Sequence, residues 1–181
     1  FQHFDDPVAG GRDPQRIDIL RSEVARRGIR GFIVPRADEH QSEYTPAHAE
    51  RLAWLTGFTG SAGTAIILDD AAALFTDGRY MLQAPGQIDT SRINVVNGTR
   101  VSMGEWLSER LRPGDSIGFD PWLHTAASIA RLRNKLESIG ARLVPQTDNP
   151  VDLIWQDQPA PPAAPAYLHP LDFAGEDTPA K

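Results

Sequence analysis

The sequence predicts an α/β domain in which a mixed six-stranded sheet lies between two layers of helices. Short apolar runs of strand length alternate with segments whose apolar residues recur at helical spacing. Two of these runs, 64–68 and 72–75, are separated only by Asp69 and Asp70, a polar break at which a hairpin turns. A single hairpin within an alternating order indicates a sheet that is mixed and not wholly parallel.

The expected helices are marked by their end signals. The first follows Asp13 and Pro14, a capping residue and a first-turn proline, and is expected to stop at Gly28. Another begins at Ser102, where Glu105 stands at the spacing of a capping box, and is expected to run through Leu111. The remaining helical segments are expected at 47–55, 78–84, 125–139 and 149–155.

The strands outside the hairpin are shorter. They are expected at 31–35, 92–96, 116–119 and 141–144. Pro145 is expected to stop the last of them, and Pro85 with Gly86 is expected to end the helical turns that follow the hairpin. Six strands and their intervening helices account for residues 13–155.

The two ends of the chain differ from this domain in composition. Residues 1–12 are rich in Gly and Asp without any period and are expected to be loose. Residues 156–181 begin with a proline-rich stretch, which is typical of a semi-rigid linker. Its prolines are Pro159, Pro161, Pro162, Pro165 and Pro170. A linker of this kind is expected to lead into a second domain.

The overall composition is that of an ordinary folded domain. With 181 residues, 40% apolar and 23% charged, the chain can bury a core without disulfides or metals. Its net charge of −6 disfavours nucleic acid and anionic membranes as partners. No apolar run approaches the ~18 residues of a membrane span, and the lack of cysteine fits a reducing compartment.

Five short blocks stand out, in order, between residues 31 and 155. They are HQSEY at 40–44, GFTGSAGT at 57–64, TDGRY at 76–80, LQA at 82–84 and VDLIW at 151–155. Each block is short, but together and at this spacing they resemble the N-terminal domain of Xaa-Pro aminopeptidases (aminopeptidase P). The resemblance implies a three-layer creatinase N-terminal fold, similar to that of ribonuclease H.

The resemblance also implies a place in a larger enzyme. This chain would be the first of three domains, and a third domain would carry two divalent metal ions, manganese or zinc. No catalytic residue and no metal ligand is then expected here, and the chain by itself should have no peptidase activity. The implied partners are peptides with proline in second position and a second copy of the chain in a homodimer, in the cytoplasm.

One side chain is singled out as a substrate ligand. An arginine guanidinium offers a planar fork that matches a carboxylate or a peptide carbonyl, and Arg79 follows a strand end, where side chains are exposed. The residues alone favour a structural pair with Asp77 or with a carboxylate at a helix end, whereas the resemblance implies that Arg79 contacts the peptide substrate. Tyr80, Tyr44 and Trp54 are candidates, with Asp77, for lining the same site.

A polar loop at 36–46 and the residues after it contain several potential metal ligands. His40, His48, Glu39, Glu43 and Glu50 are suitable types for a metal site, but their spacing matches no metal motif and polar loops collect such residues. A structural role is therefore expected for them.

The acidic residues of the hairpin region suggest a nuclease only weakly. Asp69, Asp70 and Asp77 are residue types that hold magnesium, but a turn explains the first two. The glycines of 57–64 lack phosphate-loop spacing, so a helix end and a tight turn are expected. A binding or scaffolding module without peptidase activity remains the alternative function, followed by a small-molecule binder with a pocket at 57–63.

Overall fold

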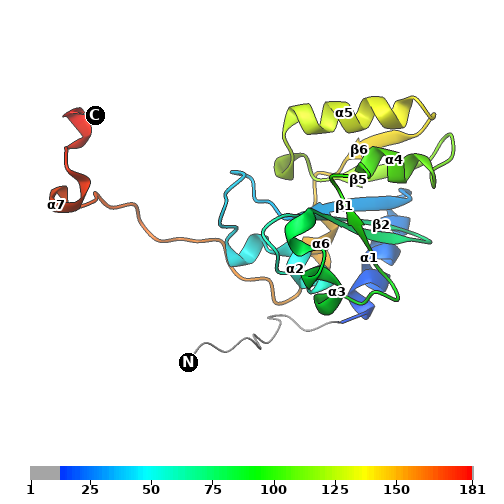
Figure 1. The fold of residues 1–181 in the computed structure, drawn as a ribbon, viewed down its shortest axis with the longest axis horizontal. Helices are drawn as coiled ribbons and strands as arrows, with labels where there is room; N and C mark the ends of the chain where they lie inside the picture. The colour runs from blue at the N-terminus through cyan, green and yellow to red at the C-terminus, as the bar shows by residue number, and fades with distance from the viewer. Residues whose placement is uncertain (1–12, 181) are drawn as a thin grey trace.

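The computed structural model describes residues 13–180 (Figure 1). The predicted loose segment 1–12 lies outside the described residues. No helix within the described range combines the length and the apolar character that crossing a bilayer requires.

A mixed six-stranded sheet forms the centre of the domain and confirms the predicted fold class. Its spatial order is β4-β3-β2-β1-β5-β6. Strand β2 runs antiparallel to both of its neighbours, while the other adjacent strands pair in parallel. The strands are β1 Gly31–Pro35, β2 Gly63–Leu68, β3 Ala72–Thr76, β4 Asn94–Asn97, β5 Ser116–Phe119 and β6 Arg142–Pro145.

Helices cover both faces of this sheet (Figure 1). The helices are α1 Gln15–Arg26, α2 Arg51–Thr56, α3 Gln83–Gln87, α4 Met103–Ser108, α5 Ala126–Glu137, α6 Pro150–Ile154 and α7 Leu171–Ala174. Single 3₁₀ turns lie at η1 Ala47–Ala49, η2 Gly78–Tyr80, η3 Pro121–Leu123 and η4 Thr178–Ala180.

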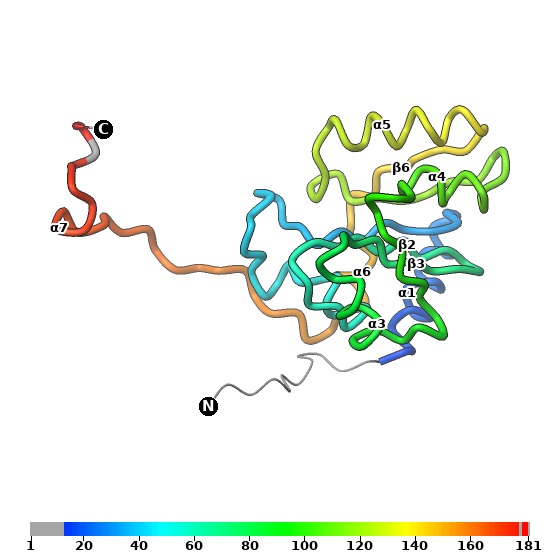
Figure 2. The backbone as a smooth tube through the Cα atoms, viewed as in Figure 1, coloured from blue at the N-terminus to red at the C-terminus, as the bar shows by residue number. Residues whose placement is uncertain are grey.

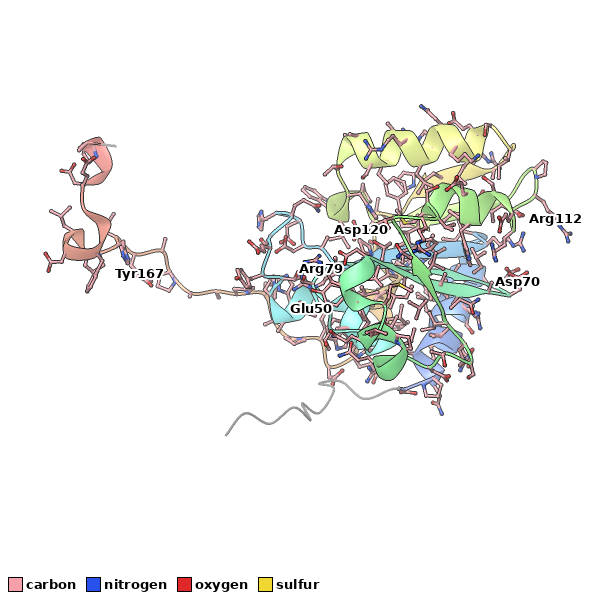
Figure 3. All side chains as sticks on the ribbon, viewed as in Figure 1. Glu50, Asp70, Arg79, Arg112, Asp120 and Tyr167 are labelled. Atoms are coloured by element: carbon pink, nitrogen blue, oxygen red, sulfur yellow. The ribbon has the colours of Figure 1, made fainter. Side chains whose placement is uncertain are left out.

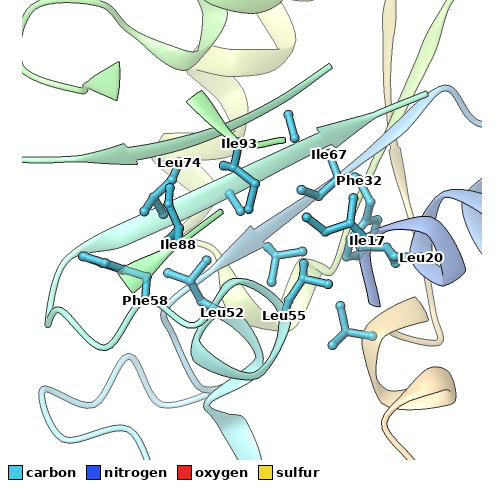
Figure 4. Close-up of a cluster of buried hydrophobic side chains, with 14 of the residues drawn as sticks. Ile17, Leu20, Phe32, Leu52, Leu55, Phe58, Ile67, Leu74, Ile88 and Ile93 are labelled. Carbon is cyan, nitrogen blue, oxygen red and sulfur yellow. The ribbon is translucent and has the colours of Figure 1, made fainter. Parts of the chain in front are cut away.

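The alternation of side chains along each strand divides the core into two clusters, because neighbouring residues of a strand point to opposite faces. In β1, Phe32 packs with α1 and α2, whereas Ile33 packs with α4 and α5. Figure 4 shows the first cluster, in which Leu20 of α1 and Leu52 of α2 lie against the sheet. This arrangement confirms the prediction of helices on both faces.

Several predicted boundaries are wrong. Helix α4 ends at Ser108 and not at the predicted Leu111, because the Arg110 amide bonds to the Leu107 carbonyl in a tighter turn. Four other boundaries are displaced, each for a local reason. The helix expected at 47–55 is divided at Glu50, whose ψ of 46° is not helical. Pro85 and Gly86 lie inside α3, because a proline in the first helical turn gives up an N–H that would have no partner there. A turn at Asp89, whose carbonyl accepts from the Arg92 amide at 3.1 Å, delays β4 to Asn94–Asn97.

The fourth misplaced boundary is the end of β6, which includes Pro145. Proline lacks the N–H of a sheet ladder, but an edge strand tolerates it, and β6 is an edge strand. The capping box of α4 is confirmed, because the Ser102 hydroxyl accepts from the Glu105 amide and the Glu105 carboxylate accepts from the Ser102 amide.

Beyond α6 the chain leaves the domain. Residues 159–170 are extended and exposed and lead to α7, far from the sheet (Figure 2). Gln158 is the last anchored residue before this segment, since its side-chain amide donates to the His48 carbonyl and to the Asp152 carboxylate, both at 2.8 Å.

Candidate functional site

The predicted site lies at one edge of the sheet, called here the carboxyl edge. The carboxyl ends of β1, β3, β4, β5 and β6 meet there, together with the beginning of β2, as the pairings of Pro35 with Thr64 and of Thr76 with Asn97 show. In open α/β sheets, ligands bind preferentially at the carboxyl ends of strands. Figure 3 shows Arg79, Glu50 and Asp120 on this side, and Asp70 and Arg112 on the opposite side.

Arg79 is held in place by its neighbour Asp77. One carboxylate oxygen of Asp77 accepts from the Arg79 amide at 2.9 Å, which caps η2, and from Arg79 Nε at 3.0 Å. The other oxygen accepts from Nη2 at 2.7 Å. The predicted structural pair is therefore present, yet the Arg79 side chain stays 66% exposed. Its outer edge, with Nη1, faces away from Asp77 and is open to a ligand.

The ion pair also shifts both ionisations. A hydrogen bond from the Arg79 side chain lowers the pKa of Asp77, and the same bond raises the pKa of Arg79. Both groups are exposed, so water screens their attraction and the pair contributes little to folding. Its effect is to orient the guanidinium.

The Tyr80 ring packs against the Arg79 guanidinium. The Arg79 guanidinium carbon lies 5.2 Å from the centre of the Tyr80 ring, within range of a cation–π contact. The Tyr80 hydroxyl lies 2.5 Å from Ser61 Oγ, and its ring meets Phe58 edge to face at 5.6 Å. Hydrogen bonding to Ser61 lowers the pKa of Tyr80. The 57–64 and 76–80 blocks therefore contact each other, and together they position Arg79.

A shallow depression of about 190 Å³ lies beside this arginine, between the ends of β2, β3 and β4. Asp77 forms part of its wall, and the Thr76 hydroxyl donates to the Ala62 carbonyl at 2.6 Å. Its lining residues are Ala62, Gly63, Thr64, Phe75, Thr76, Asp77, Gly98 and Thr99.

The other two predicted lining residues lie elsewhere. Tyr44 is 86% exposed and belongs to the loop that follows β1 at the carboxyl edge. Trp54, in α2, stacks on Trp155 at 5.2 Å and lies beneath the Arg16 guanidinium at 4.6 Å. The structure thus brings Arg79, Asp77 and Tyr80 together, while Trp54 joins α2 to α1 and the end of α6.

One residue of the carboxyl edge was missed from the sequence. Arg36 donates through Nη1 to the carbonyls of Ser61 and Glu43, both at 3.3 Å, and its Nη2 lies 3.3 Å from the Glu50 carboxylate. Burial raises the pKa of Glu50, against the attraction of Arg36. Arg36 stands in a polar loop with no local signal, so only the fold reveals that it joins the loop after β1 to the 57–64 block.

The structural interpretation of the glycines is confirmed. Gly57 ends α2 with a φ of 82°, a left-handed conformation that suits glycine. A Cβ on Gly60 would lie 2.2 Å from the Phe58 ring, and one on Gly63 would lie 2.8 Å from it. These glycines make room for the aromatic pair beneath Arg79.

The acidic residues do not form one site. Asp69 and Asp70 make the hairpin turn and pair with Arg30 at 3.1 and 3.2 Å, whereas Asp77 follows the other end of β3. Within residues 13–180, no three side chains of His, Cys, Asp or Glu are grouped to hold a metal ion.

The chain is similar to proteins of a known family. Residues 16–153 match the creatinase/prolidase N-terminal domain. The chain is 40% identical over 165 residues to "Probable Xaa-Pro aminopeptidase P" of Coccidioides posadasii, covering 90% of this chain and 25% of the relative. It is 35% identical over 170 residues to "Xaa-Pro aminopeptidase 2" of the rat, covering 93% and 25%.

Solved structures show the same fold. An X-prolyl aminopeptidase of Caenorhabditis elegans, described as a cytosolic enzyme with a di-nuclear active site, superposes with a TM-score of 0.75 at 30% identity, covering 81% of this chain and 26% of that one. The N-terminal domain of the peptidase PepQ from Mycobacterium tuberculosis superposes with a TM-score of 0.58 at 24% identity, covering 77% and 98%.

The chain spans about a quarter of the length of the Xaa-Pro aminopeptidases that it resembles. The matched region coincides with the sheet and the helices on its two faces, including the 57–64 and 76–80 blocks that hold Arg79. This chain belongs to the creatinase/prolidase N-terminal domain family.

Proposed function

We propose that this chain is the non-catalytic N-terminal domain of a metal-dependent Xaa-Pro aminopeptidase, which releases an N-terminal residue that precedes proline. The observation that carries the proposal is the exposed guanidinium of Arg79, oriented by Asp77 and Tyr80 at the carboxyl edge of a sheet whose relatives belong to such enzymes. The domain would form one wall of the substrate cleft, and Arg79 would hold the peptide.

The chemistry of Arg79 fits that role. A guanidinium keeps its charge at every physiological pH and donates two parallel hydrogen bonds to a carboxylate or to peptide carbonyls. Because Asp77 occupies Nε and Nη2, the free edge has a fixed direction before a ligand arrives. A fixed donor reduces the entropy lost when the peptide is positioned for cleavage.

The metal ions would be held outside this chain. The described residues offer no group of ligands that fits a divalent ion, so no step of the reaction is assigned to them. We therefore expect the 181-residue chain to show no cleavage of Xaa-Pro peptides when manganese or zinc is added. Homodimer formation and a cytoplasmic location belong to the same proposal, and the cytosolic description of the C. elegans neighbour supports the location.

The test is a substitution in the full-length enzyme. Arg79→Ala should lower kcat/KM for Xaa-Pro peptides by about tenfold or more, the ~1.4 kcal/mol scale of one charged contact. Arg79→Lys should give a kcat/KM between those of the wild type and Arg79→Ala, since lysine keeps the charge but lacks the planar guanidinium that donates two parallel hydrogen bonds. Arg100→Ala, which removes an exposed arginine after the neighbouring strand β4, serves as the control.

Unchanged kinetics for Arg79→Ala would remove this residue from the substrate site. The alternative function, a binding or scaffolding module without peptidase activity, predicts that the complete protein fails to cleave Xaa-Pro peptides even before substitution. Steady-state kinetics on the wild-type protein therefore separates the two functions.

A further inference from the structure

A second group of polar side chains gathers at the carboxyl edge, away from Arg79. Among the described residues, four buried side-chain atoms have no hydrogen-bond partner: Thr45 Oγ1, His48 Nδ1, Arg51 Nη1 and His124 Nε2. His48 and Arg51 line the same pocket, together with residues of η3. Buried polar groups are normally satisfied by protein or by ordered water, so two unpaired polar atoms in the wall of one pocket point to a binding site.

The pocket has a volume of about 380 Å³, within the range of ligand sites. It lies where the loop after β1 meets η3 at the end of β5. Its lining residues are Glu39, His48, Arg51, Asp120, Trp122 and Leu123.

Arg51 provides a fixed hydrogen-bond donor at this pocket. Its side chain is 10% exposed, and its Nε and Nη2 donate to the two carboxylate oxygens of Asp152 at 2.6 and 2.8 Å. Nη1 lies on the side of the guanidinium turned away from Asp152. The ion pair fixes the arginine without using this nitrogen.

Trp122 provides an apolar surface at the same pocket. Its side chain is 70% exposed, although tryptophan is a residue that normally buries most of its area. Asp120 fixes the turn that presents it, since one carboxylate oxygen accepts from the Trp122 amide at 2.9 Å and the other accepts from the Asn149 side chain at 2.9 Å. The ring is therefore held outward by a buried network.

The charge balance decides the class of ligand. The charge of Arg51 is already matched by Asp152, and Asp120 and Glu39 add negative charge to the walls. An anion would be repelled, whereas a neutral carbonyl oxygen can accept from Arg51 Nη1. Extended proline-containing peptides dock on aromatic surfaces with little loss of entropy, and the exposed Trp122 ring beside the Arg51 donor offers such a surface.

We propose that this pocket binds a proline-containing peptide, with a backbone carbonyl on Arg51 and His48 and a proline ring on Trp122. The source of the peptide rests on the proposed function: it would be the distal part of the substrate. The pocket lies at the end of β5, three strand spacings from β3 and Arg79, about 14 Å or four extended residues. One peptide can span both positions.

The chain carries a proline-rich segment of its own, anchored at Gln158 next to His48. Residues 159–170 are exposed and run away from the domain (Figure 2), which leaves the pocket open. A separate peptide is therefore the occupant that the structure favours.

The experiment uses the ¹⁵N-labelled 181-residue chain and the blocked peptide Ac-Ala-Ala-Pro-Pro-Ala-Ala-NH₂, with blocked hexa-alanine as the control ligand. We expect saturable shifts of the Trp122 indole N–H and the Leu123 amide with the proline peptide, at a Kd on the order of millimolar. Trp122→Ala and Arg51→Lys, which keeps the pair with Asp152, should each weaken binding about tenfold.

Matched variants complete the design. Tyr167→Ala removes an exposed aromatic ring outside the pocket, and Arg27→Lys alters a partly buried arginine paired with Glu23. Both should leave the Kd unchanged. Because blocked peptides and an isolated chain involve no catalysis, failure here leaves the kinetic test of Arg79 unaffected.

Any of three results would overturn the proposal: no shift at Trp122 and Leu123, equal shifts with hexa-alanine, or unchanged affinity in both Trp122→Ala and Arg51→Lys. Nuclear Overhauser contacts between the Trp122 ring and the prolines of 159–165 in the free chain would assign the pocket to the chain's own segment instead.

Discussion

At the scale of single residues, one arginine forms ion pairs at each of the two edges of the sheet, and the two arginines differ in their contacts. Arg79 pairs with a residue two positions away and stays exposed. Arg30, at the opposite edge, contacts Asp69, Asp70 and Asp115, and its Nη1 lies 2.6 Å from the Asp115 carboxylate. Arg30 therefore ties the hairpin turn to the beginning of β5, a connection between distant parts of the chain.

Asp115 makes folding depend on pH. Burial by itself would raise the pKa of Asp115, but hydrogen bonds from the Arg112 amide and the Arg30 guanidinium outweigh it, and the pKa lies below its ordinary value. A carboxyl with a lowered pKa in the folded state stabilises fully above its unfolded pKa of about 3.9. This stabilisation is lost progressively below that value, as the pH falls through the lower pKa of the folded state.

We predict that Asp115→Asn lowers the free energy of unfolding at pH 7 by about 1 kcal/mol or more, because Arg30 and the Arg112 amide lose a charged acceptor. Below pH 5 the difference from the wild type should shrink. Urea unfolding between pH 7 and pH 3 measures both effects. Ile117→Val, which removes one buried methyl group from the same strand, should lower stability equally at every pH. If the free energy of unfolding of Asp115→Asn differed from that of the wild type by the same amount at every pH, the prediction would be contradicted.

At the scale of elements, the helices that cover the sheet are short and depend on their ends. Helix α4 spans only Met103–Ser108, and its capping box satisfies amides that have no partner within the helix. It carries Trp106 and Leu107 into the core beneath β3 and β5. Its cap therefore determines how well one face of the sheet is covered.

We predict that Ser102→Ala lowers the free energy of unfolding by about 1 kcal/mol, because the Glu105 amide loses its acceptor. Ser102→Gly should cost only a few tenths of a kcal/mol, since glycine at this position leaves the amide open to water. Thermal or urea unfolding of the two variants measures the difference. Equal losses, or a larger loss for glycine, would show that the cap does not limit the stability of α4.

At the scale of the whole molecule, one folded body ends at α6 and an extended arm follows. The Arg51–Asp152 pair and the stacking of Trp54 on Trp155 fasten α6 to α2. Beyond Gln158 the arm is exposed, and Tyr167 lies on it far from the sheet (Figure 3). The side chains of Tyr167 and Leu168 are 86% and 87% exposed. The predicted boundary near residue 156 therefore separates a packed region from an unpacked one.

We predict that limited chymotrypsin digestion cuts the chain first at Tyr167 or Leu168 and leaves a resistant fragment that contains the whole sheet. An exposed extended backbone fits a protease site, whereas cutting inside the domain requires local unfolding. Mass spectrometry of the digest identifies the first cut. Tyr44, equally exposed but in a loop tied by Asp38 and Arg36, provides the internal comparison. Earlier cutting at Tyr44 would contradict the prediction.

Local signals in the sequence predicted the fold class, the two faces of helices, the hairpin and the capping box, because periodicity and end signals act over a few neighbouring residues. The same local signals favoured a structural pair for Arg79, with Asp77 as one of its possible partners. Only the folded chain reveals that Tyr80 and Ser61 support that arginine, that Trp54 belongs to another cluster, and which polar atoms stay unpaired in the pocket beside Trp122. Such contacts depend on where distant segments meet, and strand order across the sheet is not encoded in any local pattern.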